Sequence, residues 1–359
     1  MIGPIERIYA GLLDRQYEVE LFGGLPGFER KGSGYIACCP FHEDTLPTLV
    51  IYSDRPEYFC FACSCRGDWV RYLQLKEGLS FEDARSLLSG RAGIEARGYG
   101  RSLWERELAR TVLLENAASF FTTELFAPPG EEVLRYLYRR GYAMGEVEGS
   151  GFGFYPGFSQ LKEYLLSQGM NDVLASEEPA GIWSRDAESF RLTIPYRDFC
   201  GRLMGIIGRD IAKAGPEAYR PLTDLSPLVD TPFLIYKARG REEIIIVEGL
   251  FDALLVDQIG IKPAIAIGRS GLSTGRLDAI EASGIRRCIL ALGGGLEKRQ
   301  RTLQTARLIE SRGLEAVILP IPDEYEDLDR FIRSTDLHDF KKLLKKGRSV
   351  EQWSAGICN

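Results

Sequence analysis

Histidine is almost absent from this sequence, in which His42 and His338 are the only two among 359 residues. A hydrolase triad of the serine type needs a histidine base, so this scarcity argues against that class of enzyme. Long apolar runs are also missing, and the segment Met1 to Arg7 lacks the charged-then-apolar pattern of a secretion signal. We therefore expect a globular, cytoplasmic protein without a membrane-spanning segment.

An excess of positive charge is missing as well. The formal net charge is −6, and the sequence pI is near 5.4. Proteins that bind nucleic acid tightly are usually basic, because the counterions released from neutralised phosphates supply much of the affinity. Either the chain does not bind nucleic acid, or it binds weakly through a local basic surface that lies beside acidic regions.

Cysteine, by contrast, is plentiful: five of the eight cysteines lie within residues 38–65. In a cytoplasmic chain such a cluster indicates metal ligands, not disulfides. A Cys-x2-His pair and a Cys-x2-Cys pair, each short enough for one tight turn to present two ligands, predict a closed zinc site of the structural type. Cys38 and Cys65 flank this set and rank second as ligands. The predicted zinc ligands are Cys39, His42, Cys60 and Cys63.

Composition divides the chain into segments and predicts an α+β protein of several domains. The cysteine-rich segment is expected to end in a helix at residues 80–88, and a polar stretch containing glycine follows as a linker. Apolar residues at helical spacing predict a helix at 112–125, and strands are expected at 190–196 and 202–208. The predicted divisions are a zinc domain at 1–90, a linker at 91–103, a mixed α/β region at 104–240, an alternating region at 241–335, and a basic helix with a frayed tail at 336–359.

Residues 241–335 alternate between short apolar strands and helices. Such alternation produces a parallel sheet that helices cover on both faces. Ligands of open parallel sheets bind outside the carboxyl ends of the strands, so the residues that follow these strands are candidates for a site. The expected strands lie at 244–247, 264–267, 288–292 and 316–320.

Acidic residues follow the first and the last of these strands. Glu248 and Asp252 are four positions apart with a glycine between them, and Asp327 and Asp329 lie two apart after the last strand. Carboxylate oxygens at such positions suit a divalent cation. The same residues would also serve as helix caps or as a solvated charge run, so the pattern by itself leaves these interpretations open.

Four short stretches in and around the cysteine segment carry a family resemblance. These stretches are Cys39-Pro40-Phe41-His42, Pro47-Thr48, Phe59-Cys60-Phe61-Ala62-Cys63 and Gly67-Asp68. Together they closely resemble the CHC2 zinc ribbon of DnaG-type DNA primases. The resemblance implies one structural Zn²⁺ ion and a ribbon that contacts single-stranded template DNA.

Arginines and aromatic residues alternate within the ribbon. The resemblance implies that Arg55 and Arg66 contact phosphates while neighbouring rings stack on bases. The same rings would alternatively form the small core of the ribbon, and we favour that interpretation for Phe61 and Trp69. The rings concerned are Tyr58, Phe59, Phe61 and Trp69.

The acidic sets resemble the Toprim domain of primases and topoisomerases. The glutamate-glycine-x-x-aspartate motif of that family matches Glu248 to Asp252, and the late aspartate-x-aspartate of primases matches Asp327 to Asp329. The resemblance implies a Toprim α/β domain at 241–335, preceded by the amino-terminal subdomain of a primase core. It also implies catalytic Mg²⁺ or Mn²⁺ held by Glu248, Asp327 and Asp329, with Asp252 as a further catalytic carboxylate. Three arginines before this domain, Arg191, Arg209 and Arg220, are the implied contacts with nucleotide or template.

One part of the primase pattern is missing. At the end of the third strand the family has aspartate-glycine-aspartate, whereas this sequence reads Gly293-Gly294-Gly295. Two carboxylate ligands are therefore absent, and the loss of one electrostatic group in other enzymes lowers the rate about 100- to 1000-fold. Glu297 is the nearby carboxylate that would substitute. No lysine lies between Lys213 and Lys237, where the family places lysines, and Arg220 is the candidate replacement.

Two functions follow from this resemblance. The first is a DNA primase, a nucleotidyltransferase that joins ribonucleoside triphosphates into short RNA primers on single-stranded DNA for replication. The alternative is a catalytically weakened, zinc-dependent accessory that binds single-stranded DNA in a replication system or mobile element. A nuclease or topoisomerase is less expected, since it needs the same missing carboxylates. A replicative helicase is a candidate primosome partner, although we expect no counterpart of the family's helicase-binding domain.

Overall fold

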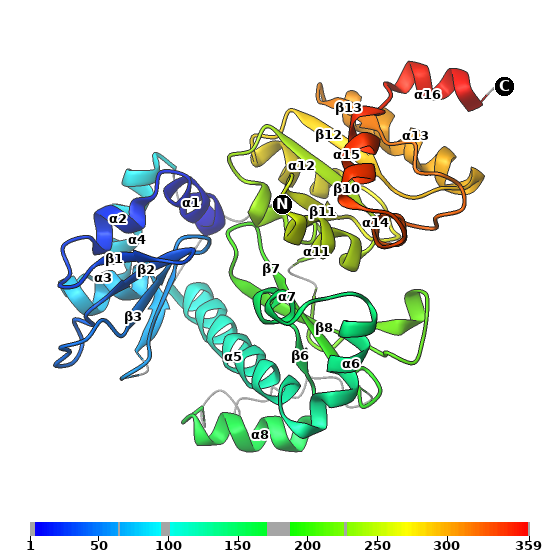
Figure 1. The fold of residues 1–359 in the computed structure, drawn as a ribbon. Coiled ribbons are helices and arrows are strands. Elements are labelled where there is room, and N and C mark those ends of the chain that lie inside the picture. Colours follow the sequence, from blue (N-terminus) through cyan, green and yellow to red (C-terminus); the bar gives the residue numbers. More distant parts are fainter. Residues whose placement is uncertain (1–3, 64, 95–100, 171–186, 226–227, 358–359) are drawn as a thin grey trace. The chain divides into compact units, whose positions relative to one another are not determined.

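A computed structural model describes residues 4–63, 65–94, 101–170, 187–225 and 228–357, and Figure 1 draws its helices and strands. Two compact units, residues 2–227 and 228–359, make up the chain, and each is described by itself. Among the described residues, no helix combines the length and the apolar character that crossing a membrane requires.

The amino-terminal part is a five-stranded antiparallel sheet with four helices, coloured blue to cyan in Figure 1. Each strand pairs with the next along the chain, in the order β1-β2-β3-β4-β5. The strands are β1 (Glu29–Lys31), β2 (Gly34–Ala37), β3 (Leu49–Tyr52), β4 (Glu57–Cys60) and β5 (Arg66–Asp68). The helices are α1 (Pro4–Leu13), α2 (Tyr17–Phe22), α3 (Trp69–Glu77) and α4 (Phe81–Ala92), the last of which confirms the helix predicted at 80–88.

A buried carboxylate connects the elements of this part. Asp68 is 3% exposed and ends β5, where it caps α3 by accepting a hydrogen bond from the Arg71 N–H at 2.9 Å. Its Oδ2 also accepts from the Tyr9 hydroxyl at 2.7 Å and from the Trp104 indole N–H at 2.9 Å. Because Tyr9 lies on α1 and Trp104 on the helix that follows the ribbon, Asp68 joins three helices through hydrogen bonds that burial strengthens.

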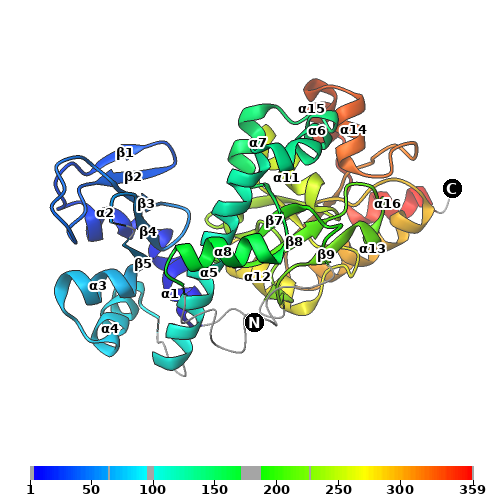
Figure 2. The same ribbon diagram turned by 90° about the horizontal axis from the view of Figure 1, so that it is seen from below.

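A second antiparallel sheet and a long helix, α5 (Arg101–Leu125), complete the first unit. The sheet order is β6-β7-β8-β9, and α5 packs on it with α8 beside it (Figures 1 and 2). Leu113, Ala117 and Phe121 of α5 are buried in that interface, so the predicted amphipathic helix is confirmed. The other elements are η1 (Pro128–Gly130), α6 (Glu131–Arg139), α7 (Met144–Ser150), β6 (Gly153–Phe154), α8 (Phe158–Ser167), β7 (Leu192–Arg197), β8 (Leu203–Arg209), η2 (Pro216–Ala218) and β9 (Tyr219–Pro221).

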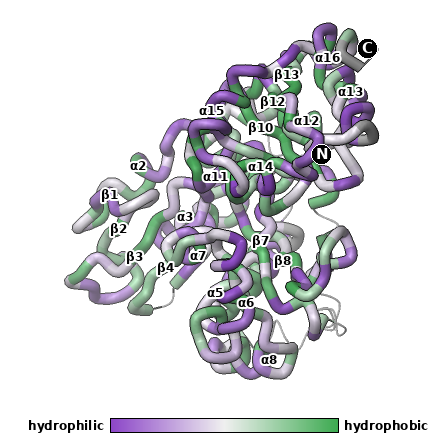
Figure 3. Tube along the Cα trace, turned by 45° about the vertical axis from the view of Figure 1, so that its right-hand side comes forward, coloured by the Kyte–Doolittle hydropathy of each residue, from purple (hydrophilic) through white to green (hydrophobic). Residues whose placement is uncertain are grey.

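The second unit is built on a four-stranded sheet with the order β11-β10-β12-β13, in which every pair is parallel. The predicted parallel sheet is therefore confirmed, and Figure 3 colours its strands mainly as hydrophobic. Val247 at the end of β10 pairs with both Ala266 and Ala291, so the carboxyl ends of three strands meet at one edge. The elements are η4 (Ile235–Ala238), β10 (Glu243–Val247), α11 (Leu250–Ile259), β11 (Ala264–Ala266), α12 (Thr274–Ala282), β12 (Arg287–Ala291), α13 (Leu296–Glu310) and β13 (Glu315–Ile318).

Three further helices follow the sheet: α14 (Leu328–Ser334), α15 (Leu337–Lys345) and α16 (Val350–Ile357). The predicted basic helix is present as α15, but the prediction of a frayed tail is wrong for α16. Arg348 pairs with Ile318 through two backbone hydrogen bonds of 2.8 and 2.9 Å, which cover the edge strand β13. Phe340 and Trp353 are buried, so apolar contacts hold these helices against the unit.

We expect Asp68→Ala to destabilise the first unit by about 3–5 kcal/mol, because it removes a helix cap and leaves two buried donors without an acceptor. Urea unfolding followed by tryptophan fluorescence measures this change. Ser80→Ala removes only the exposed cap of α4 and should cost about 1 kcal/mol. Equal costs for the two variants would contradict the role of Asp68 as a buried junction.

Candidate functional site

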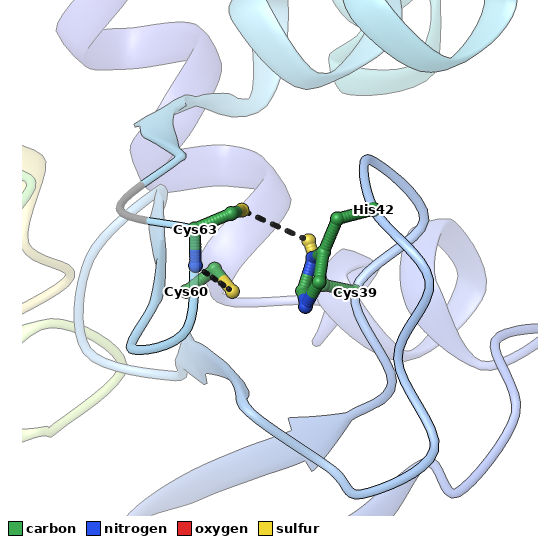
Figure 4. A group of neighbouring side chains, drawn as sticks. All are labelled: Cys39, His42, Cys60 and Cys63. Carbon is green, nitrogen blue, oxygen red and sulfur yellow. Dashed lines mark hydrogen bonds between the residues drawn. The ribbon is translucent and has the colours of Figure 1, made fainter.

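The four predicted zinc ligands converge at one point (Figure 4). One ligand atom from each of Cys39, His42, Cys60 and Cys63 lies within 4.8 Å of the others, and the Cys39 and Cys63 sulfurs are 3.8 Å apart. Cys39 and His42 lie in the loop after β2, whereas Cys60 ends β4 and Cys63 lies in the turn beyond it. Within the described ranges, no other group of three or more histidine, cysteine or acidic side chains gathers so closely.

The donor set fits zinc. His42 Nδ1 is buried without a hydrogen-bond partner among the described residues, so it is available as a ligand. Its Nε2 lies 3.9 Å from Asp44, a position from which a carboxylate orients the ring. Burial and the neighbouring thiols raise the pKa of Cys39 to about 12. A zinc ion would bind the unpartnered nitrogen and stabilise the Cys39 thiolate, which burial disfavours.

Asp44 organises the loop that carries the first two ligands, and the sequence analysis did not identify it. Its Oδ2 accepts hydrogen bonds from the Cys39 N–H at 2.8 Å and from the Thr48 hydroxyl at 2.6 Å. These hydrogen bonds lower the pKa of Asp44. The sequence feature that could have identified Asp44 is its spacing of four residues from Thr48, just after His42, which suits a loop closed by one carboxylate.

The aromatic residues of the ribbon divide into core and surface. Tyr58 and Trp69 are at most 1% exposed, whereas Phe61 is 70% exposed. The core interpretation is therefore correct for Trp69 and wrong for Phe61. Phe61 lies in the ligand turn beyond β4, where its ring contacts Phe59 edge-on at 4.9 Å and the sheet no longer covers it.

A cavity of about 230 Å³ lies between strands β3–β5 and helices α5 and α8. Phe59 and Phe61 line it, and the Arg66 guanidinium lies 5.0 Å above the Phe59 ring. Arg55 also lines it, but its Nε donates to Glu57 at 3.1 Å. The structure thus brings both predicted arginines and three of the four predicted rings to one cavity, and a hydrogen bond to Glu57 holds Arg55 there.

Buried charges surround this cavity. Glu115 on α5 pairs with Arg197 of β7 at 2.6 Å, and Arg197 lowers the pKa of Glu115 despite its burial. Glu57 is 9% exposed, and its Oε1 has no hydrogen-bond partner in the described residues. Burial, followed by repulsion from Glu115, raises the pKa of Glu57 to about 8, although Arg55 opposes the shift. Of these two carboxyls, the raised pKa favours the protonated form of Glu57, and the lowered pKa favours the charged form of Glu115.

The other predicted arginines make internal contacts. Arg209 is 7% exposed and donates to the Tyr136 hydroxyl at 2.8 Å. Arg191 donates to two backbone carbonyls at 3.3 and 3.2 Å, and Arg220 lies 6.0 Å from the Phe190 ring. The contact of these three arginines with nucleotide or template stays a prediction.

Three of the four predicted catalytic carboxylates meet at the carboxyl edge of the parallel sheet. Asp252, in the first turn of α11, accepts a hydrogen bond from the Asp329 N–H at 2.8 Å, and each of these residues is 5% exposed. Asp327 caps α14. Burial, then repulsion from Asp327 and Asp329, raises the pKa of Asp252 to about 7, and burial raises the pKa of Asp327. With Glu248 they do not form a ligand set as close as the zinc ligands.

Basic side chains surround Glu248, the fourth of these residues. Its carboxylate oxygens lie 3.5 Å from Arg269, 3.7 Å from Arg301 and 3.8 Å from Lys298. The Glu248 side chain is 15% exposed, so these ion pairs are only partly screened by water. The residue predicted to hold a divalent cation is therefore already neutralised by cations of the chain itself.

The glycine loop that replaces the expected aspartates is fixed in shape. Gly293 has φ +104°, and a Cβ there would lie 2.2 Å from the Glu326 carbonyl oxygen and 2.9 Å from Lys298 Nζ. Gly295 has φ 91° and ψ 154°, a region that only glycine populates readily. Aspartates at both positions would thus require a different loop. The Glu297 side chain lies outside the described residues, so its predicted substitution remains untested.

Comparison with known proteins assigns the class of each part. Residues 6–101 match the family model of the CHC2 zinc finger. Together with the assembled ligands, this match identifies the amino-terminal part as a CHC2-type zinc module. The remaining described residues share the fold of solved primase cores.

The chain is homologous to bacterial DNA primases. The DNA primase of Thermotoga maritima is 28% identical over 345 residues, which are 93% of this chain and 60% of that protein. The DNA primase of Chlamydia trachomatis is 25% identical over 92% of this chain and 57% of its own length. The predicted resemblance to DnaG-type primases is therefore confirmed, and the chain spans less than two thirds of the length of these relatives.

Solved primase structures share the fold. The zinc-binding and RNA polymerase domains of Aquifex aeolicus primase superpose with a TM-score of 0.63 at 23% identity, covering 97% of this chain and 86% of that one. A DnaG primase catalytic domain bound to single-stranded DNA gives a TM-score of 0.54 at 20% identity, covering 69% of this chain and 81% of that one. The predicted fold class, with a zinc ribbon before a primase-type core and a parallel sheet, is confirmed.

Cys60→Ser should abolish zinc binding and unfold the ribbon, because metal binding and folding of such sites are one equilibrium. Metal analysis of the purified chain and hydrogen exchange over residues 35–70 measure the two effects. Cys38→Ser is the matched control, since Cys38 lies outside the ligand set, and it should retain zinc. Unchanged zinc content in Cys60→Ser would overturn the ligand assignment.

Glu57 should make the stability of the first unit depend on pH. Its folded pKa of about 8 lies above the ordinary value of 4.5. The folded state therefore keeps a proton that the unfolded state loses, so this stabilisation is complete below about pH 4.5 and is lost as the pH rises towards 8. The groups facing Glu57 are Glu115, Arg55, Arg197 and Arg202.

The test compares urea midpoints at pH 5 and pH 8. The midpoint of Glu57→Gln, which cannot ionise, should fall less over this range than that of the unmodified chain. Glu132→Gln, at an exposed position on α6, should behave as the unmodified chain does. Parallel pH profiles for all three proteins would contradict a protonated Glu57.

Proposed function

We propose that this chain is a DNA primase that joins ribonucleoside triphosphates into short RNA primers on single-stranded DNA. The observation that carries the proposal is that homology to DNA primases runs continuously through the zinc module and the core, over 93% of the chain. A protein that retained only the zinc module, or only the core, would match DNA primases over that part alone. The chain spans 60% of that relative, so activity, substrates and partners are inferred here, including a cytoplasmic location and a replicative helicase as partner.

The cavity of the first unit is the proposed template contact. Phe59 and Phe61 offer ring faces for stacking on unpaired bases, and Arg66 offers a cation close to the same rings. Base stacking tolerates any sequence, which suits a protein that must read many templates. With a net charge of −6, affinity should be modest and should depend on this local surface.

The carboxylates of the second unit are the proposed nucleotide site. Phosphoryl transfer requires cations that neutralise the triphosphate. Glu248, Asp252, Asp327 and Asp329 are the donors that the sequence offers at the carboxyl edge of the sheet. Their present arrangement does not fit a divalent cation, because they are not gathered around one point and Glu248 is paired with basic side chains. A bound nucleotide carries its own divalent cation in solution.

A second candidate function has a specific observation in its favour. Gly293 and Gly295 replace two carboxylates, and their backbone shape excludes a simple return of aspartate. A chain with this loop would keep zinc and bind single-stranded DNA while its catalysis is weak or absent. It would then act as an accessory of a replication system or of a mobile element.

Primer synthesis separates the two candidates. The zinc-loaded chain is incubated with single-stranded DNA, labelled ribonucleotides and Mg²⁺ or Mn²⁺, and the products are resolved by length. We expect short RNA from the unmodified chain and a loss of about 100-fold or more in Glu248→Gln. Glu243→Gln is the matched control, since Glu243 lies at the opposite end of β10 and pairs with Lys262.

Absence of product, with single-stranded DNA still bound in a fluorescence anisotropy titration, would replace the primase proposal with the accessory. Product that survives in Glu248→Gln would remove Glu248 from the site. Loss of both product and DNA binding would reject both candidates.

A further inference from the structure

Lys298 occupies an unusual place at the carboxyl edge of the parallel sheet. It lies in the first turn of α13, directly after the glycine loop. Its ammonium donates to the Glu326 carbonyl oxygen at 2.6 Å and lies 3.8 Å from the Glu248 carboxylate. It also lies 2.9 Å from the point where a Cβ on Gly293 would be. The ammonium therefore fills the space that a side chain at position 293 would enter.

The same ammonium acts on the other carboxylates of this edge. Burial is the main cause of the raised pKa of Asp252 and of Asp327, and the charge of Lys298 opposes both shifts. The Lys298 side chain is 27% exposed, and a backbone oxygen fixes its end. A freely solvated lysine would not keep its charge in one place, since long side chains lose considerable entropy when they are held.

The arrangement resembles a cation-binding site in which a lysine side chain of the protein takes the position of the cation. Asp252 and Asp329 are each 5% exposed, and such buried groups need a positive partner or must remain protonated. Arg333 is the partner of Asp329 at 2.9 Å, whereas Lys298 lies at the Glu248 side of this edge. A divalent ion bound to the Glu248 carboxylate would lie close to the charged groups of Lys298, Arg269 and Arg301, which are 3.5 to 3.8 Å from that carboxylate. Like charges at this separation repel, so the chain disfavours a metal ion there.

We propose that the Lys298 ammonium is a built-in counter-ion of the Glu248 carboxylate and, together with Arg269 and Arg301, takes the place of a divalent cation at this edge. The glycine at position 293 makes room for it. This replacement goes beyond the proposed function, because it concerns how the apo site is neutralised and holds whether or not primers are made. Its test measures metal binding, so a failure of one proposal is distinguishable from a failure of the other.

The test is a Mn²⁺ titration of the zinc-loaded full chain, with free Mn²⁺ measured by electron paramagnetic resonance. The unmodified chain should bind Mn²⁺ weakly. Lys298→Met removes the ammonium but keeps an unbranched side chain, and it should bind Mn²⁺ at least about tenfold more tightly, with Mg²⁺ competing. Adding Glu248→Gln to that variant should abolish the gain.

Lys262→Met is the matched control, because Lys262 pairs with Glu243 at the opposite end of the same strand. It loses the same charge and should not gain Mn²⁺ binding. Lys298→Arg keeps a cation and should stay as weak as the unmodified chain. Tight Mn²⁺ binding by the unmodified chain would overturn the proposal even if Lys298→Met does not fold. Equal affinities of Lys298→Met and Lys262→Met would do the same.

Discussion

Buried negative charge constrains this protein more than any other single factor. Thiolates, aspartates and glutamates lie in its interior, and each requires a compensating cation, a set of donors or a retained proton. The zinc module provides a metal site for its thiolates, and three donors from separate helices surround Asp68. The second unit meets the same requirement at Glu248 with lysine and arginine side chains.

These ways of compensating buried negative charge differ in whether they leave room for a ligand. The zinc site is closed, since four protein ligands leave no position for a substrate, and its role is structural. The carboxylate edge lies where parallel sheets bind ligands, beyond the ends of strands β10 and β12. The cations at Glu248 in this structure are lysine and arginine side chains of the chain itself. The zinc module therefore brings together the ligand set expected for its class, and the departure from the primase pattern at the sheet edge is the glycine loop.

Local sequence pattern predicted the parallel sheet of the second unit correctly. The alternation in residues 241–335 gave each strand of the parallel sheet to within a few residues, because buried parallel strands are short, apolar and bounded by helices. The helix α16 was missed, since its stability comes from docking Trp353 and covering β13, and neither contact is a local property. The burial of Trp69 was predicted, but the exposure of Phe61 was not. Both belong to the same aromatic pattern, and Phe61 is exposed because β4 ends at Cys60, just before it.

The candidate site residues also divide into those that the sequence predicted and those that only the tertiary structure revealed. Spacing alone was sufficient to predict which four side chains gather at the candidate zinc site, because a two-residue gap brings both members of a pair to one turn. It did not reveal that Arg209 is buried against Tyr136, because that contact joins residues far apart in the sequence. The Glu57 proton and the pairing of Lys298 with Glu248 were also beyond sequence reasoning, since both depend on which charges folding brings within a few ångströms.

The sequence by itself determined the class of protein, the four side chains that gather at the predicted zinc site and the strands of the parallel sheet, since these depend on residue types at short spacing. Only the tertiary structure decided how the carboxylates at the sheet edge are neutralised. Electrostatic interactions fall off with distance and strengthen with burial, so the partner of each charge is fixed by packing and not by position along the chain.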